Sequence, residues 1–202
     1  MKEKIAQKAA DMFIHYGFKS VTMDDIAEAM GISKKTIYAH FKNKTELVKE
    51  AVLSVYHSIT CGIDHIREQY DNPIEELYEI KKFALTQLKN ERSSPQYQLQ
   101  KYYPDIFEML RGMQFEKMHE CTVQNIEKGI EKGVYRDDLN VEFVSRVYFM
   151  GINGIKDDTL FPLELFPKHE LMEEYLEYHL RGIVTKEGLK TLEKFIKTHH
   201  DD

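Results

Sequence analysis

Apolar residues recur at helical spacing along most of the chain, and no segment shows the alternation of apolar and polar residues typical of a strand. The first helix is predicted from such a set of positions, which ends before Gly17, a residue suited to close a helix. Its apolar positions are Ile5, Ala9, Met12, Phe13 and Tyr16. The pattern therefore predicts that the chain begins with an amphipathic helix.

Two short helices are predicted next, each with its own start signal. Thr22 can cap a helix over residues 23–30, and Gly31 can end that helix. Only two residues later, Ser33 can cap a second helix over residues 34–40. A helix, a tight turn and a second helix form the helix-turn-helix arrangement found in DNA-binding proteins.

A longer helix is predicted from Asn43, whose side chain can cap it, and its apolar stripe extends to Ile59. Prolines, all of them beyond residue 72, and turn residues separate the helices that follow. These helices are predicted at residues 74–91, 96–102, 105–132, 140–157, 168–183 and 186–199. The fold class is therefore predicted to be all-α, with a helix-turn-helix domain over 1–47 and a larger helical domain over 48–202.

The charge distribution supports this division of the chain. The formal net charge of −6 argues against general binding to polyanions. Residues 1–47, however, hold eight Lys against six acidic residues, so this part has a net charge of +2 and the rest of the chain has −8. The first arginine is Arg67, so the basic part lacks the planar guanidinium that suits guanine. Phosphate contacts are therefore expected to contribute more affinity for DNA than base reading does.

Composition excludes several classes of protein. A chain of 202 residues, 42% of them hydrophobic, can bury a sizeable core. No apolar run reaches the roughly 18 residues of a membrane span, and no secretory signal is visible, so a cytoplasmic protein is expected. Cys61 and Cys121 are expected to be reduced thiols. Each has a histidine at ligand spacing, His65 and His119, but no third ligand, so neither a metal nor another cofactor is expected.

The spacing of the helix-turn-helix residues carries a family resemblance. It resembles the DNA-binding signature of TetR-family transcriptional regulators, through the pattern Thr22-x-x-x-Ile26-Ala27-x-x-x-Gly31-Ile32-Ser33-x-x-Thr36-Ile37-Tyr38-x-His40-Phe41-x-x-Lys44-x-x-Leu47. The resemblance covers roughly residues 5–50, and the rest of the chain is similar only in length and helical rhythm. It implies a homodimer that binds a palindromic operator in double-stranded DNA, with the helix at 34–40 of each subunit in the major groove.

The same resemblance implies roles for single residues. Contacts to bases or to the DNA backbone are implied for Lys34, Lys35 and Thr36, and phosphate contacts for Tyr38, His40 and Lys44. Thr22, which opens the signature, completes the candidate DNA-binding set. Asp24 lies where some relatives place a basic residue that reads bases. A carboxylate can accept a hydrogen bond from cytosine N4, or it can serve only the helix dipole.

The middle of the chain is rich in aromatic and methionine side chains. These residues could form plain core, or the apolar effector cavity that the resemblance implies. The candidate pocket residues are Phe83, Tyr102, Tyr103, Phe107, Met113 and Phe149. The implied effector is an unidentified, partly apolar small molecule.

Two of the later predicted helices, at 140–157 and 168–183, resemble the pair that forms the intersubunit four-helix bundle in this family. Either apolar stripe could instead pack within its own domain. The candidate dimer interface consists of Val144, Val147, Tyr148, Gly151, Ile155, Leu171, Tyr175, Tyr178 and His179.

The residues and the resemblance together predict a ligand-responsive DNA-binding transcriptional regulator that acts as a repressor. The alternative is an effector-binding or protein-interaction helical module that no longer acts through DNA. An enzyme is not expected, because no serine or cysteine nucleophile has a recognisable base partner and no glycine-rich phosphate loop is present.

Overall fold

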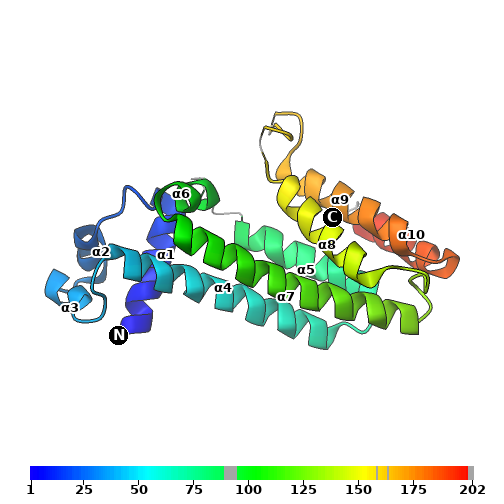
Figure 1. Ribbon diagram of the computed structural model, residues 1–202, viewed down its shortest axis with the longest axis horizontal. Coiled ribbons are helices and arrows are strands. Elements are labelled where there is room, and N and C mark those ends of the chain that lie inside the picture. Colours follow the sequence, from blue (N-terminus) through cyan, green and yellow to red (C-terminus); the bar gives the residue numbers. More distant parts are fainter. Residues whose placement is uncertain (89–94, 158, 163, 200–202) are drawn as a thin grey trace. The chain divides into compact units, whose positions relative to one another are not determined.

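The computed structural model describes residues 1–88, 95–157, 159–162 and 164–199, and these residues form helices joined by short connections (Figure 1). The helices are α1 (Lys2–Tyr16), α2 (Met23–Met30), α3 (Lys34–Tyr38), α4 (Lys44–Gln69), α5 (Pro73–Leu88), α6 (Pro95–Tyr102), α7 (Pro104–Glu131), α8 (Val141–Gly154), α9 (Lys168–Ile183) and α10 (Lys186–His199). No strand occurs among the described residues, where the β-type pairing is an isolated bridge between Tyr135 and Val184. The predicted all-α class is confirmed. No described helix is both long and apolar enough to cross a membrane.

The helix starts agree closely with the sequence predictions, and the differences lie at the helix ends. α4 continues to Gln69, ten residues beyond the apolar stripe that predicted it. α3 ends at Tyr38 and α8 at Gly154, each before the predicted end. The predicted helix over 74–91 includes residues 89–91, which lie outside the described part of the chain.

The first of two compact units consists of residues 1–62 and 86–114, so it includes α1 to α3, most of α4, α6 and the start of α7. Its core is continuous: Ile5, Phe13, Ile26, Ile37 and Leu47 are fully or almost fully buried in it. Leu99 of α6 and Ile106 of α7 belong to the same core. The helix-turn-helix is therefore packed on residues that follow it by more than fifty positions.

The second compact unit consists of residues 63–85 and 115–202. Its core includes Ile74 and Tyr78 of α5, Tyr148 of α8, Leu176 of α9 and Leu192 of α10. Because α4 and α7 each contribute to both units, the division does not fall at one point of the sequence. The boundary predicted between residues 47 and 48 falls inside α4.

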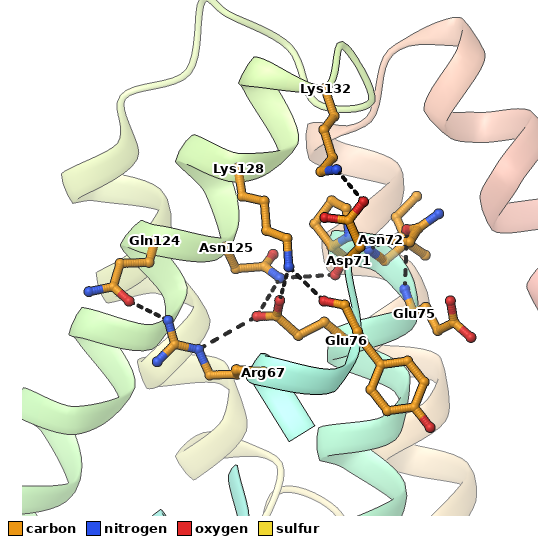
Figure 2. A network of polar contacts seen from close by, with 12 residues as sticks. Arg67, Asp71, Asn72, Glu75, Glu76, Gln124, Asn125, Lys128 and Lys132 are labelled. Carbon is orange, nitrogen blue, oxygen red and sulfur yellow. Dashed lines mark hydrogen bonds and ion pairs between the residues drawn. The ribbon is translucent and has the colours of Figure 1, made fainter. Parts of the chain in front are cut away.

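A buried polar network joins α4, α5 and α7 within the second unit (Figure 2). The Glu76 carboxylate, on a residue only 2% exposed, accepts hydrogen bonds from Asn125 Nδ2 at 3.0 Å and Lys128 Nζ at 2.9 Å. Arg67 Nε lies 3.7 Å from the same carboxylate, and the Arg67 guanidinium also donates to Gln124. Tyr135 Oη donates to Asn125 Oδ1, so the amide is held from both ends. A buried carboxylate is tolerated here because cations and donors surround it.

Candidate nucleic-acid interface

The turn between α2 and α3 depends on the backbone conformation of one glycine. Gly31 has φ +63°, in the left-handed region that side chains disfavour. In this conformation the Gly31 N–H donates to carbonyls at the end of α2, and the next residue, Ile32, donates to Ala27 O at 3.0 Å. The turn therefore ends α2 and redirects the chain into α3 within three residues.

Hydroxyl side chains cap both helices of the motif. Thr22 Oγ1 accepts from the Asp25 backbone N–H, and the Asp25 carboxylate accepts from the Thr22 backbone N–H at 2.7 Å, which completes a capping box. The Thr22 backbone N–H and hydroxyl both donate to the Asp25 carboxylate, and these hydrogen bonds lower the pKa of Asp25. At α3, Ser33 Oγ accepts from the Thr36 N–H at 3.1 Å and lies 2.8 Å from the Thr36 hydroxyl. Among the predicted DNA contacts, Thr22 and Thr36 thus have structural roles in the free protein.

Burial decides which face of α3 meets solvent. Ile37 is 0% exposed and Phe41 1% exposed, so they anchor the helix in the core of the first unit. The side chains of Lys35, Tyr38 and His40 remain exposed, and Tyr38 is 46% exposed. Among the described residues, none forms a hydrogen bond with the Tyr38 hydroxyl. This face presents cationic and hydrogen-bonding groups to solvent.

Lys44 is held differently from the other predicted contacts. Its ammonium donates to the backbone carbonyl of Phe18 at 2.6 Å and lies over the Phe13 ring. Partial burial lowers the pKa of Lys44 by desolvation, although nearby Asp25 raises it. In the free protein Lys44 therefore ties the start of α4 to the loop between α1 and α2. A phosphate contact at Lys44 remains a prediction, which would use its remaining N–H groups.

Lys34 is not an isolated cation. Its ammonium lies 2.7 Å from the carboxylate of Asp24, on α2, and both side chains are exposed to solvent. The hydrogen bond that Lys34 donates to the Asp24 carboxylate is the largest cause of the raised pKa of Lys34. The sequence analysis named both residues as candidates but did not predict their contact, because ten positions separate them and the turn at Gly31 brings them together.

The six predicted pocket residues divide between the two units. Tyr102, Tyr103, Phe107 and Met113 belong to the first, and Phe83 and Phe149 to the second. Tyr103 and Phe107 pack against the core of the first unit, whereas Phe149 contacts Phe115 edge to face. A surface hollow of about 490 Å³ in the second unit is lined by Asn72, Lys190, Thr191, Lys194 and Phe195, none of them a predicted pocket residue. A pocket formed by the predicted residues remains a prediction.

The predicted interface residues on α8 and α9 include buried ones. Leu171, Tyr148 and His179 are at most 9% exposed within the single chain, so they offer little outward surface. The rings of Tyr148 and His179 pack on each other between α8 and α9. The Tyr175 hydroxyl donates to the Val147 and Tyr148 carbonyls, and a side chain at Gly151 would overlap the Tyr175 ring. Val144 packs on the core of the second unit, and Ile155, the residue after the end of α8, is half-buried. Val147 and Tyr178 are exposed.

A different apolar face of α8 is exposed to solvent. Phe143 is 64% exposed, Val147 42% and Met150 70%, at spacings of four and three residues, and Tyr178 of α9 is 78% exposed. We call Phe143, Val147, Met150 and Tyr178 the α8–α9 apolar face. The predicted interface does not include Phe143 and Met150, although their spacing relative to Val147 is also helical.

One serine does have a base partner in the structure, contrary to the sequence interpretation. Ser145 Oγ lies 2.8 Å from His119 Nδ1, and His119 Nε2 lies 3.2 Å from the Glu142 carboxylate. Ser145 is 0% exposed and also donates to the Glu142 carbonyl, so no substrate can reach its hydroxyl. The arrangement links α7 to α8. Within the described part of the chain, no group of three or more His, Cys, Asp or Glu residues could hold a metal ion.

The first unit thus has the geometry of a helix-turn-helix DNA-binding head. Residues 5–51 match the family described as "Bacterial regulatory proteins, tetR family". The HTH-type transcriptional repressor KstR2 of Mycolicibacterium smegmatis is 23% identical over 202 residues, which cover 94% of this chain and 93% of that protein. Residues 5–51 therefore form a TetR-family DNA-binding domain, and the chain is a DNA-binding transcriptional regulator.

Other relatives match part of the chain or its fold. The biofilm operon icaADBC HTH-type negative transcriptional regulator IcaR of Staphylococcus epidermidis is 31% identical over 82 residues, 40% of this chain and 43% of that protein. A transcriptional regulator from Cytophaga hutchinsonii has a similar fold, with a TM-score of 0.74 at 19% identity, covering 91% of this chain and 98% of that one. SmeT, the repressor of the Stenotrophomonas maltophilia efflux pump SmeDEF, has a TM-score of 0.71 at 18% identity, over 92% and 91%.

Proposed function

We propose that this protein is a ligand-responsive repressor that binds a palindromic operator as a homodimer, with α3 of each subunit in the major groove. The observation that carries the proposal is the burial pattern of α3. Ile37 and Phe41 fix the helix in the core, while Lys35 and Tyr38 of α3 and His40 just after it are left exposed. The names of the relatives KstR2 and IcaR, both negative regulators, favour repression over activation.

The cations of the head set the expected mode of binding. The candidate cationic contacts, Lys34, Lys35 and Lys44, are all lysines, and the first arginine of the chain is Arg67. A lysine ammonium neutralises phosphate as a point charge but lacks the planar fork that binds guanine bidentately. Affinity for the operator should therefore fall steeply with salt concentration.

Fluorescence anisotropy with DNA from upstream of the protein's own gene tests this proposal. Tyr38→Phe keeps the ring and removes one hydroxyl, so roughly tenfold weaker binding is expected with unchanged thermal stability. Lys35→Ala should weaken binding and reduce the slope of log K against log salt by about 0.9. Lys82→Ala, at an exposed lysine of α5, is the matched control for lost charge. Wild-type protein that binds no such DNA, or binds it independently of salt, would refute the proposal.

We assign the dimer contact to the α8–α9 apolar face. Three large side chains at helical spacing on α8 are exposed, Tyr178 of α9 is exposed as well, and apolar surface of this kind marks interaction sites. A palindrome requires two heads related by a twofold axis, so the contact must be self-complementary. Met150→Lys should shift sedimentation toward the monomer, whereas Ser58→Lys, at an exposed position of α4, should not. Equal sedimentation of both variants would exclude this face.

Ligand response would arise from an effector that binds the two DNA-binding arrangements of the dimer with different affinity. Aromatic and methionine side chains in α5, α7 and α8 suit a partly apolar effector. Thermal shift against a panel of small apolar acids, sterols and aromatic metabolites would find candidates, because a ligand of the folded state raises the melting temperature. A true effector must also change operator affinity in the anisotropy assay.

A further inference from the structure

Asp24 has a partner that helix capping does not explain. The cap of α2 is complete without it, because Thr22 and Asp25 satisfy each other's polar groups. The Asp24 carboxylate instead lies 2.7 Å from Lys34 Nζ and so connects the first turn of α2 with the first turn of α3. Glu28, another exposed acid of α2, has no such partner among the described residues.

Stability gives little reason for this contact. The Lys34 side chain is 48% exposed and that of Asp24 66%, and ion pairs between exposed groups contribute little to folding. In a head that binds phosphate through lysines, Asp24 also neutralises one of the cations. The pair is therefore better explained by what it presents at the DNA-binding surface.

The pair presents a hydrogen-bond acceptor beside a donor. In the major groove, the C·G base pair presents the matching pattern, with the cytosine N4 amine as donor and guanine O6 and N7 as acceptors. N4 and O6 are hydrogen-bonded to each other and so lie about 2.9 Å apart, close to the 2.7 Å between the Asp24 carboxylate and the Lys34 ammonium. Each side chain keeps capacity for DNA, because an ammonium has three donors and a carboxylate accepts several hydrogen bonds.

We propose that Asp24 and Lys34 act as one unit that reads a C·G base pair in each half-site: Asp24 accepts from cytosine N4, and Lys34 donates to guanine O6 and N7. The proposal rests on the DNA-binding function proposed above. It makes Asp24 a specificity-determining residue in a head that has no arginine for guanine.

The chemistry ranks the four base pairs at this position. An A·T pair also offers an amine beside a carbonyl, but thymine adds a methyl group, and the adenine N7 lies on the far side of the amine from O4. G·C and T·A place a carbonyl oxygen opposite the carboxylate, which repels it. C·G should therefore be preferred over A·T by a few fold, and over the two reversed pairs by tenfold or more.

Selection from a randomised double-stranded DNA library, followed by anisotropy on the enriched sites, tests the proposal with the full-length protein. Asp24→Asn is the informative variant, because an asparagine amide pairs bidentately with adenine N6 and N7. It should change one position per half-site from C·G to A·T and leave the rest of the motif unchanged. Asp24→Ala should lose preference at that position alone. Glu28→Gln, which removes a charge from the same helix, is the control and should select the wild-type motif.

The outcomes separate this inference from the function on which it rests. A wild-type protein that enriches no sequence would overturn the DNA-binding proposal itself. If wild-type protein and both Asp24 variants enrich the same motif, Asp24 does not read a base and the inference is wrong. A uniform change in affinity for all sequences in Asp24→Ala would also overturn it, since Asp24 would then act only through its charge or by positioning Lys34.

Discussion

Replacing Glu76 with alanine should destabilise the second unit more than any neighbouring surface change. The substitution removes the carboxylate that Asn125, Lys128 and Arg67 share, and it leaves their donors facing a nearly closed site. Breaking a buried ion pair from one side costs about 3–5 kcal/mol. The Lys128 side chain is 26% exposed and can regain some water, so the lower end, about 3 kcal/mol, is expected. That is a large part of the stability of an ordinary domain.

Urea denaturation followed by circular dichroism measures this loss as a lower transition midpoint. Glu75→Ala is the matched control, because Glu75 is the adjacent residue of α5 and its side chain has no partner among the described residues. A change within about 0.5 kcal/mol is expected for the control. In a double-mutant cycle, Glu76→Ala and Lys128→Ala should be coupled by about 1 kcal/mol or more. A cost below about 1 kcal/mol for Glu76→Ala would show that the network does not hold the three helices together.

Three further substitutions have definite expected outcomes. Burial lowers the pKa of His179 from 6.5 to about 4. As the pH falls, His179 therefore takes up a proton in the unfolded chain before it does so in the folded one. The free energy of unfolding of the wild type should drop between pH 6.5 and 4 by about 3 kcal/mol relative to His179→Gln. Equal pH profiles would contradict this. Gly151→Ala should cost about 1–3 kcal/mol because its Cβ overlaps Tyr175, whereas Gly154→Ala, with open space around it, should cost nothing measurable in the same melt. Ser33→Ala should cost about 1 kcal/mol through loss of the α3 cap, against no change in Ser20→Ala.

The helix-turn-helix could be predicted from the sequence because local signals determine it. The caps at Thr22 and Ser33 and the turn at Gly31 act within a few residues, and the structure contains all three. The partner of a charged side chain cannot be predicted in this way, because it can lie far away in the sequence. Lys44 bonds to the Phe18 carbonyl, 26 positions away, and neither residue type indicates such a contact.

The inner and outer faces of α8 could not be told apart for a related reason. Its sequence, VEFVSRVYFMGING, has apolar residues all around the helix, so periodicity alone gives two possible stripes. The Tyr148 stripe is the inner one because Tyr175 and His179 of α9 pack on that side. The burial of the Glu76 carboxylate could not be predicted from the sequence either, since a single glutamate in a charged helix is ordinarily solvated.

The core that Leu99 and Ile106 complete limits how the DNA-binding head can be isolated or transplanted. A fragment that stops at residue 62 would leave the apolar surface of Phe18 and its neighbours without α6 and the start of α7. Gln98 also packs against Gly17 so closely that a side chain there would overlap it. A chimaeric regulator with a new effector domain would therefore need residues 95–114 together with 1–62, and a shorter graft should be prone to aggregation.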